Sequence, residues 1–232
     1  MVNLLKSFSA KANVVVVGAS GGIGQAAVRL LNDDPSVGIV HAFSRDATNS
    51  QDGKVHCFPI AVLDEQSIKT AVQVATSQAP LDLVFVASGM LHRDDVVQPE
   101  KSMGQLTIAA MSEVLSVNTI GPALLPKHFL PAMRKTGKSV FATLSARVGS
   151  ISDNRTGGWV SYRASKAALN MVVKTLSIEQ ARRRQDSIVV SLDPGTVDTA
   201  LSKPFSRNVS EDSLFTPAQY LRRHNRRPTF SM

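Results

Sequence analysis

The feature that most limits the fold of this chain is a glycine-rich turn between an apolar run and a helix pattern. Residues 13–17 are short, apolar and β-branched, which predicts a buried parallel strand. The turn follows at once as Gly18-Ala-Ser-Gly-Gly-Ile-Gly24, and residues 25–31 then carry apolar side chains at helical spacing. This order favours a dinucleotide-binding unit, in which backbone N–H groups and a helix N-terminus hold a pyrophosphate. The alternative is a tight turn without a ligand.

Strand and helix patterns alternate along the whole chain. The predicted strands are 13–17, 38–43, 55–60, 82–87, 139–144 and 187–192, and the predicted helices are 22–32, 65–77, 107–134, 160–183 and 217–223. The long helix 107–134 is expected to bend at Pro122 and Pro126. The alternation predicts an α/β fold, namely a Rossmann-like doubly wound parallel sheet in three layers. A chain of 232 residues is expected to form one domain, residues 1–232.

A second motif, Tyr162-Arg-Ala-Ser-Lys166, places a phenol and an ammonium on one face of a helix. A free phenol has a pKa near 10 and is a poor proton donor or acceptor at neutral pH. A neighbouring ammonium favours the phenolate and so lowers that pKa. The alternative is a tyrosine beside an unrelated surface lysine on an amphipathic helix.

Four segments, and their order along the chain, resemble the short-chain dehydrogenase/reductase family. Residues 17–24 are similar to its Thr-Gly-x-x-x-Gly-x-Gly signature, with Val17 in the Thr position, and residues 161–170 to its Tyr-x-x-x-Lys helix. Residues 194–199 resemble the loop that holds the nicotinamide, and residues 116–119 resemble the helix that carries the family's catalytic Asn. The resemblance covers roughly residues 12–217, and it narrows to the C-factor subgroup, with its sniffer-type carbonyl reductases, at residues 144–154, 157–159 and 199–205.

The resemblance implies an NADP-dependent carbonyl reductase. Tyr162 would act as the general acid, and Lys166 would lower its pKa and contact the nicotinamide ribose. Asn118 would hold a proton-relay water, and Ser145 would hydrogen-bond the substrate oxygen, with Ser150 as the alternative. A stricter Ser-x-x-Gly register would instead place Ala146 at the catalytic serine position. The residues implied to bind cofactor are Gly18, Ser20, Gly21, Gly22, Ile23, Gly24, Ser44, Arg45, Ser88, Gly89, Tyr162, Lys166, Pro194, Gly195, Val197 and Thr199.

The choice of cofactor rests on the end of the second predicted strand. An acidic residue there would accept a hydrogen bond from an NAD ribose and would repel a 2′-phosphate. The chain has Ser44 and Arg45 instead, and a guanidinium pairs well with a phosphate. We therefore expect NADP(H) to be preferred over NAD(H). The alternative is a solvated arginine on a loop.

Three departures from the family pattern leave a second function open. Ala61 stands where the family has an Asp that contacts adenine, and residues 86–89 read Val-Ala-Ser-Gly where it has Asn-Asn-Ala-Gly. The resemblance stops after Pro217, so residues 218–232 form an atypical tail that we expect to add little to the core. The seventh strand of the family is then missing, which leaves 187–192 as a sheet edge. The alternative function is a catalytically weak nucleotide-binding or C-factor-like signalling protein.

Composition adds weaker expectations. The net charge is +8, and we interpret the arginines at 222, 223, 226 and 227 as a solvated tail rather than a nucleic-acid site. No run of roughly 20 apolar residues is visible, so no membrane partner is expected. The single Cys57 excludes an internal disulfide and fits a reducing, cytoplasmic setting. No metal site is predicted, and the five histidines are interpreted as surface or loop residues. The resemblance also implies a small carbonyl or alcohol substrate and a homodimer or homotetramer.

Overall fold

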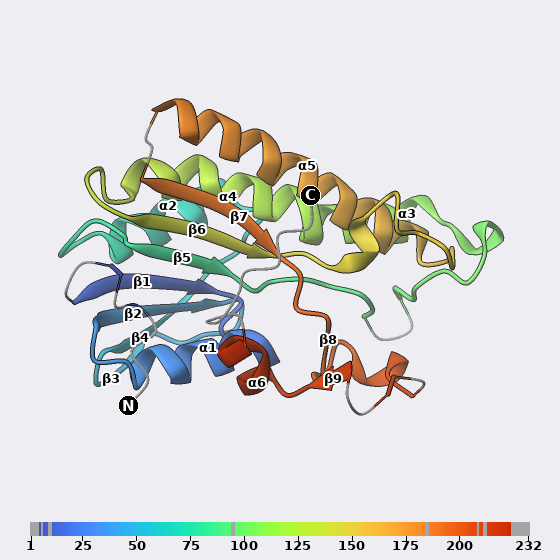
Figure 1. The fold of residues 1–232 in the computed structure, drawn as a ribbon, viewed down its shortest axis with the longest axis horizontal. Coiled ribbons are helices and arrows are strands. Elements are labelled where there is room, and N and C mark those ends of the chain that lie inside the picture. The colour runs from blue at the N-terminus through green and yellow to red at the C-terminus, as the bar shows by residue number, and fades with distance from the viewer. Residues whose placement is uncertain are drawn as a thin grey trace.

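A sheet of seven strands runs through the centre of the structure (Figure 1). The computed structural model describes residues 5, 7–8, 11–93, 96–183, 186–207, 209–210 and 213–223. The sheet order is β3-β4-β2-β1-β5-β6-β7, and every pair is parallel except β3 with β4. The strands are β1 (Ala12–Val17), β2 (Val37–Ser44), β3 (Ser50–Asp52), β4 (Val55–Pro59), β5 (Leu83–Val86), β6 (Ser139–Leu144) and β7 (Ser187–Leu192).

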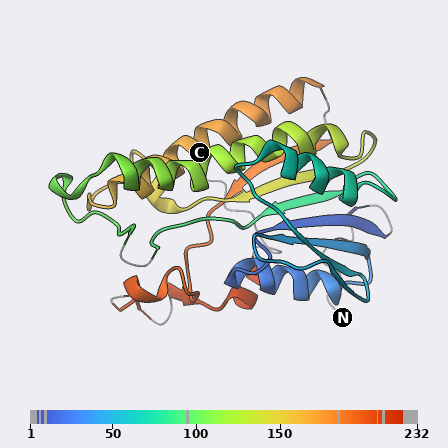
Figure 2. The same ribbon diagram turned by 180° about the vertical axis from the view of Figure 1, so that it is seen from behind.

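Helices cover both faces of this sheet, which confirms the predicted doubly wound fold (Figures 1 and 2). Helices α2, α4 and α5 lie on one face, and α1 and α6 lie on the other. Strand β1 serves both cores, because Val15 and Val17 pack with the first set and Val14 and Val16 with the second. The helices are α1 (Gly22–Asn32), α2 (Glu65–Ala75), α3 (Ile108–Leu115), α4 (Gly121–Phe129), α5 (Val160–Arg183) and α6 (Pro217–Arg223).

The predicted long helix 107–134 is one helical run with an irregular middle. A π-helical turn, Ser116–Ile120, joins α3 to α4, and a 3₁₀ turn, Leu130–Ala132, ends the run. The extra residue per turn therefore lies just before Pro122, and Pro126 lies inside α4. By length and composition alone this 25-residue run is apolar enough to cross a membrane, a criterion that the core helix of a soluble protein also meets. Helix α3 packs on α5 and α4 packs on α2, and Leu125 and Phe129 of α4 belong to the same core cluster as residues of β1 and β5.

Three short strands were not predicted. Strand β3 forms an antiparallel hairpin with β4 at one sheet edge. Strand β8 (Thr196–Val197) pairs with β9 (Leu214–Phe215) in a separate two-stranded parallel sheet, at the lower right in Figure 1. Two-residue strands give too little alternation for a sequence pattern to reveal them. This pair anchors the segment between residues 197 and 214 at both of its ends.

The start of the atypical tail belongs to the core, and this corrects a sequence expectation. Helix α6 packs on α1, and Tyr220 is only 2% exposed within the second core. Leu221 packs against the same core. Residues 224–232, including Phe230, lie outside the described residues. Within the described part, β7 pairs only with β6, as expected for a strand at the sheet edge.

His41 is a second correction, because it is buried rather than on the surface or in a loop. It lies on β2, faces His56 on β4 with ring centroids 5.9 Å apart, and stacks near Phe43 and Phe58. Its Nδ1 has no hydrogen-bond partner within the described residues. Burial, and then the nearby His56, lower the pKa of His41 to about 4.

Candidate active site

The glycine turn is built for close approach of backbone to backbone. Gly18 has φ +86°, and a Cβ there would lie 2.6 Å from the backbone nitrogen of Ser88. A Cβ on Gly24 would lie 2.1 Å from the carbonyl oxygen of Gly18. Only glycine fits both places, so the turn stays tight between the ends of β1 and β5. Ser20, Gly21 and Gly22 remain exposed at the start of α1, and Ile23 is half-buried.

The predicted nicotinamide loop contacts this glycine turn. A Cβ on Gly22 would lie 2.6 Å from Cγ2 of Thr199, so the loop and the turn touch. Gly195 has φ +66°, and Val197 is buried in β8. The structure thus brings 195–199 to the same edge of the sheet as the turn, which is where parallel α/β sheets bind nucleotides.

A buried polar atom between these segments fits a dinucleotide. Oγ of Ser88 is buried and has no hydrogen-bond partner among the described residues. Ser88 follows β5 and contacts the glycine turn at Gly18. A buried hydroxyl without a partner costs free energy unless a ligand satisfies it. The cradle around Gly18 and the lone Ser88 hydroxyl therefore suit the ribose and pyrophosphate of a nicotinamide dinucleotide.

Tyr162 and Lys166 lie one turn apart near the start of α5, as predicted. Nζ of Lys166 lies 5.9 Å from the centroid of the Tyr162 ring and donates to the Leu144 carbonyl over 3.0 Å. Lys166 is buried, so its ammonium is held between the end of β6 and the helix. An ammonium has three N–H donors, and the Leu144 carbonyl takes one of them.

Burial changes the proton affinities of both members of this pair. Burial, followed by the negative charge of Asp193, raises the pKa of Tyr162 to about 12. Burial also lowers the pKa of Lys166 to about 8. The phenol pKa is thus raised in the protein alone, because burial disfavours the charged phenolate, and the expectation that Lys166 lowers it stays a prediction. At neutral pH the phenol is protonated, which is the form of a proton donor.

Asn118 lies in the π-helical turn. π-Helical turns within α-helices often accompany functional sites. Its Oδ1 accepts from the Met90 N–H over 2.7 Å, and its Nδ2 donates to the Met90 carbonyl over 2.7 Å and to Ser165 Oγ over 3.1 Å. A Cβ on Gly89 would lie 3.5 Å from Asn118 Oδ1 and 3.6 Å from Lys166 Nζ. Gly89, Asn118 and Lys166 therefore meet just beyond the end of β5.

Ser145, expected to hydrogen-bond the substrate oxygen, has a partner within the protein that the sequence did not predict. Its hydroxyl donates to Oδ1 of Asn170 over 2.6 Å. Ser150 lies in the next loop, with its Oγ near Ser152 and the N–H of Asp153. Among the described residues, neither serine forms a hydrogen bond with Tyr162. Asn170 was not predicted, although its spacing of four from Lys166 places it on the same helix face.

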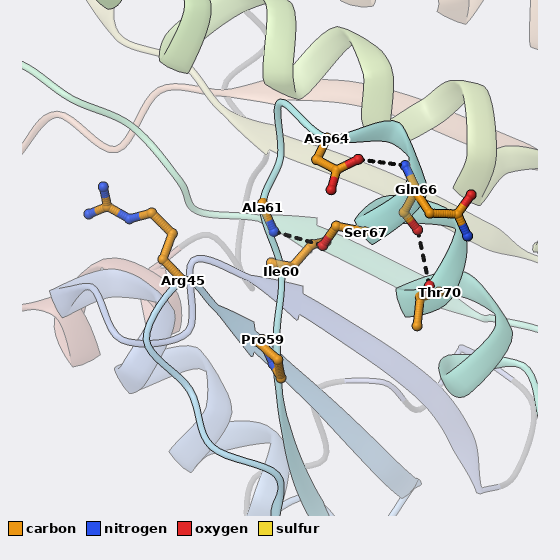
Figure 3. Close-up of a pocket in the computed structure, with 8 residues that line it drawn as sticks. All are labelled: Arg45, Pro59, Ile60, Ala61, Asp64, Gln66, Ser67 and Thr70. Carbon is orange, nitrogen blue, oxygen red and sulfur yellow. Dashed lines mark hydrogen bonds between the residues drawn. The ribbon is translucent and has the colours of Figure 1, made fainter.

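A pocket of about 460 Å³ opens beside the end of β2 (Figure 3). Arg45 is exposed on its rim, and its guanidinium extends away from the side chains of α2. Ala61 turns its N–H to Ser67 Oγ at 2.9 Å, and Asp64 caps α2 through the Gln66 N–H at 2.9 Å. The pocket is lined by Arg45, Pro59, Ile60, Ala61, Asp64, Gln66, Ser67 and Thr70. Ser44, at the end of β2, is almost fully buried.

Comparison with known proteins agrees with this geometry. The family model for short chain dehydrogenases matches residues 12–210. The chain is 31% identical over 208 residues to 1-hydroxy-2-glutathionyl-2-methyl-3-butene dehydrogenase of Rhodococcus sp. (strain AD45), covering 89% of this chain and 85% of that protein. It is 33% identical over 113 residues to C-signal of Myxococcus xanthus, covering 49% of this chain and 67% of that protein.

A solved structure shows the same fold. The NADPH-bound carbonyl reductase from chicken fatty liver superimposes with a TM-score of 0.75 at 26% identity, covering 93% of this chain and 86% of that one. The residues that the family model matches, 12–210, include the main sheet, the glycine turn and the Tyr–Lys helix described above. This chain therefore belongs to the short chain dehydrogenase/reductase family, whose enzymes act on carbonyl and alcohol groups.

Proposed function

We propose that this protein is an NADP-dependent carbonyl reductase. The observation that carries the proposal is the meeting of Tyr162, Lys166, Asn118 and Gly89 at the sheet edge that also holds the glycine turn. The cofactor, when bound, supplies or accepts a hydride. The residues of this chain then have to orient the substrate carbonyl and exchange one proton with its oxygen.

The protonation state of Tyr162 supports reduction as the favoured direction. A phenol with a pKa of about 12 carries its proton at neutral pH and donates it to a developing alkoxide. The buried Lys166 supplies positive charge near that oxygen and has donors for a ribose hydroxyl. Asn118 ties α3 and α4 to the segment after β5 through Met90, which keeps Gly89 close to Lys166.

The preference for NADP(H) rests on the end of β2. Arg45 is exposed on the rim of the pocket in Figure 3, so its guanidinium can reach a 2′-phosphate without desolvation of the rest of the site. No acidic residue stands at Ser44 or Arg45 to repel that phosphate. Asp64 lies in the same pocket, but its Oδ1 caps α2.

One observation favours the second candidate, a catalytically weak nucleotide-binding or C-factor-like signalling protein. The only hydrogen of the Ser145 hydroxyl is donated to Asn170, so this serine does not donate to a substrate oxygen in this arrangement. For Ser145 to act in catalysis, its hydroxyl would have to break the hydrogen bond to Asn170. The stretch of similarity to C-signal is consistent with this candidate.

The assembly, the location and the domain organisation also belong to this proposal. We infer one domain that forms a homodimer or homotetramer through the long helices, where Ile108, Ile120, Met171 and Ile178 leave large apolar side chains exposed. We infer a cytoplasmic protein with a small carbonyl or alcohol substrate and without nucleic-acid or membrane partners.

A thermal-shift titration with NADPH and NADH tests the cofactor site, and NADPH oxidation with butane-2,3-dione then tests turnover. The carbonyl reductase requires a larger shift with NADPH than with NADH, together with NADPH consumption that depends on the dione. A shift without turnover over a panel of reactive carbonyl compounds would favour the weakly catalytic candidate. No shift with either nucleotide would contradict both.

A further inference from the structure

Trp159, just before α5, holds a backbone conformation that is unusual for a large side chain. Its φ is +52°, and it follows Gly157 and Gly158 with φ +63° and +65°. Glycine adopts this region freely, whereas a bulky residue there is an outlier. Such strain persists only where the surrounding structure imposes it, and it concentrates at functional sites. Trp159 therefore needs an explanation from its surroundings.

Glu100 holds Trp159 through its backbone carbonyl and holds the start of α5 through its buried side chain. The Trp159 N–H donates to the backbone carbonyl of Glu100 over 2.5 Å. The side chain of Glu100 accepts from the Ser161 N–H over 3.2 Å and from the Ser161 hydroxyl. Glu100 is only 3% exposed, and its side chain lies at the N-terminus of α5. The start of the helix that carries Tyr162 is thus fixed at Ser161 by a residue that is 61 positions away in sequence.

The fixed indole belongs to a row of rings beside Tyr162. The centroid of the Trp159 ring lies 6.3 Å from that of Tyr162 and 5.3 Å from that of Phe205, edge to face in both cases. His92 continues the row, with its centroid 5.6 Å from Phe205 and its Nε2 3.4 Å from the Ala200 carbonyl oxygen. Trp159, Phe205 and His92 come from three separate segments, and all three are half-buried rather than enclosed.

We propose that Trp159, Phe205 and His92 form the specificity-determining wall of the substrate site, and that this wall selects carbonyl compounds with a planar aromatic ring beside the carbonyl group. The inference rests on the proposed function. A substrate oxygen that accepts the Tyr162 proton places the carbonyl substituents beside Tyr162, where Trp159 is the adjoining ring. Aromatic rings prefer edge-to-face or offset partners, and such pairs add to the gain from burial alone.

The strain at Trp159 agrees with this role. A glycine at 159 would take the same φ without steric cost, as the two preceding residues do. The tryptophan instead places the largest apolar surface of any side chain next to the proton donor. The wall joins the loop after β5, the segment before α5 and the loop after β8, so its three rings are placed by three fixed points rather than by one loop.

The kinetic test compares three diones with NADPH: 1-phenylpropane-1,2-dione, 1-cyclohexylpropane-1,2-dione and butane-2,3-dione. The measured quantity is the phenyl-to-cyclohexyl ratio of kcat/KM, and comparing this ratio between variants cancels the intrinsic reactivity of each dione. We expect Trp159→Gly to lower the ratio about tenfold and Trp159→Phe to keep most of it. Ile151→Gly, which removes an 86% exposed apolar side chain from the same loop, is the matched control and should leave the ratio unchanged.

Stability separates loss of selectivity from loss of fold. Trp159→Gly relieves the positive-φ strain, so its melting temperature should not show the large loss expected when a core aromatic residue is truncated. Phe205→Leu is the second variant, because it keeps an apolar side chain and removes only the ring. A ratio that stays at the wild-type value in both Trp159→Gly and Phe205→Leu would overturn the proposal.

A binding test is independent of turnover, because Trp159 is the single tryptophan of the chain. Acetophenone and 1-cyclohexylethanone are titrated into the Tyr162→Phe variant saturated with NADP⁺, and the fluorescence of Trp159 is recorded. We expect saturable quenching with acetophenone at a concentration about tenfold lower than any effect of the cyclohexyl ketone. Equal effects would contradict an aromatic site.

These outcomes distinguish failure of the aromatic wall from failure of the proposed reductase activity. Turnover of butane-2,3-dione without a phenyl preference would overturn the wall and leave the reductase intact. Binding of NADPH without turnover of any dione would overturn the reductase, and the fluorescence titration would then decide whether the aromatic site exists.

Discussion

The hydroxyl of Ser145 donates to Oδ1 of Asn170 over 2.6 Å. Asn170 lies on α5, eight residues and about two helical turns after Tyr162. A hydroxyl has one hydrogen, so the same group does not donate to a substrate at the same time. This contact joins the end of β6 to the middle of the active-site helix. It gives Ser145 a structural task that the sequence pattern does not show.

We therefore expect Ser145→Ala to keep most of the turnover and to lower the free energy of unfolding by about 1 kcal/mol, the usual net value of one hydrogen bond. Urea unfolding and steady-state NADPH oxidation measure the two effects on the same preparation. If Ser145→Ala is as inactive as Tyr162→Phe, the hydroxyl leaves Asn170 during the reaction, and the catalytic assignment from the sequence is correct.

Tyr162→Phe removes one hydroxyl and keeps the ring that packs against Trp159. Loss of the proton donor should lower kcat by about 10²–10⁴-fold while NADPH binding is kept. Dicarbonyl turnover and a thermal-shift titration are the two measurements. A variant that turns over at the wild-type rate would remove Tyr162 from the mechanism.

Arg45→Asp should weaken NADPH binding about tenfold or more, because a charge-assisted contact to phosphate is worth about 1.5–3 kcal/mol. NADH binding should change far less, since NADH has no 2′-phosphate. Arg182→Asp, at an exposed position near the end of α5, changes the net charge equally and serves as the control. An equal loss for both cofactors would show that Arg45 is structural.

His41 should make the fold sensitive to mild acid. Its pKa is about 4 when folded and 6.5 when unfolded, so between these values the unfolded chain binds more protons and stability falls as pH decreases. From pH 7 to pH 5 this contributes a loss of roughly 1–2 kcal/mol. His41→Phe keeps the ring stack with Phe43 and Phe58 and should reduce the difference between melting temperatures at the two pH values. An unchanged difference would mean that other groups cause the acid sensitivity.

The two parts of the tail should behave differently. Deletion of residues 222–232 removes four arginines, lowers the net charge from +8 to +4, and should leave the melting temperature nearly unchanged. Tyr220→Ala should cost about 3 kcal/mol or more, because it empties a core position. For a domain of this size that corresponds to a drop of roughly 6 °C or more in melting temperature. Differential scanning calorimetry decides, and a large drop on deletion would show that the end of the chain is packed.

Most of the main sheet and its helices could be predicted from the sequence alone. Strand β6, strand β7, helix α1 and helix α5 have the predicted bounds, because long apolar runs and helical spacing are local signals. The glycine turn was also predictable, since its strand–turn–helix order is contained within about twenty residues. The small strands β3, β8 and β9 were not predictable, because a pair of two or three residues depends on partners elsewhere in the chain.

The sequence by itself determined the order of the elements, the Gly18–Gly24 turn and the placement of Tyr162 and Lys166 on one helix face, because each is set by spacing within one segment. Only the tertiary structure decided that the Ser145 hydroxyl turns to Asn170, that Tyr220 is buried and that Glu100 holds the start of α5. It also decided the high pKa of Tyr162, since desolvation depends on what packs around the phenol. These properties arise from contacts between residues far apart in the chain, and no local pattern contains them.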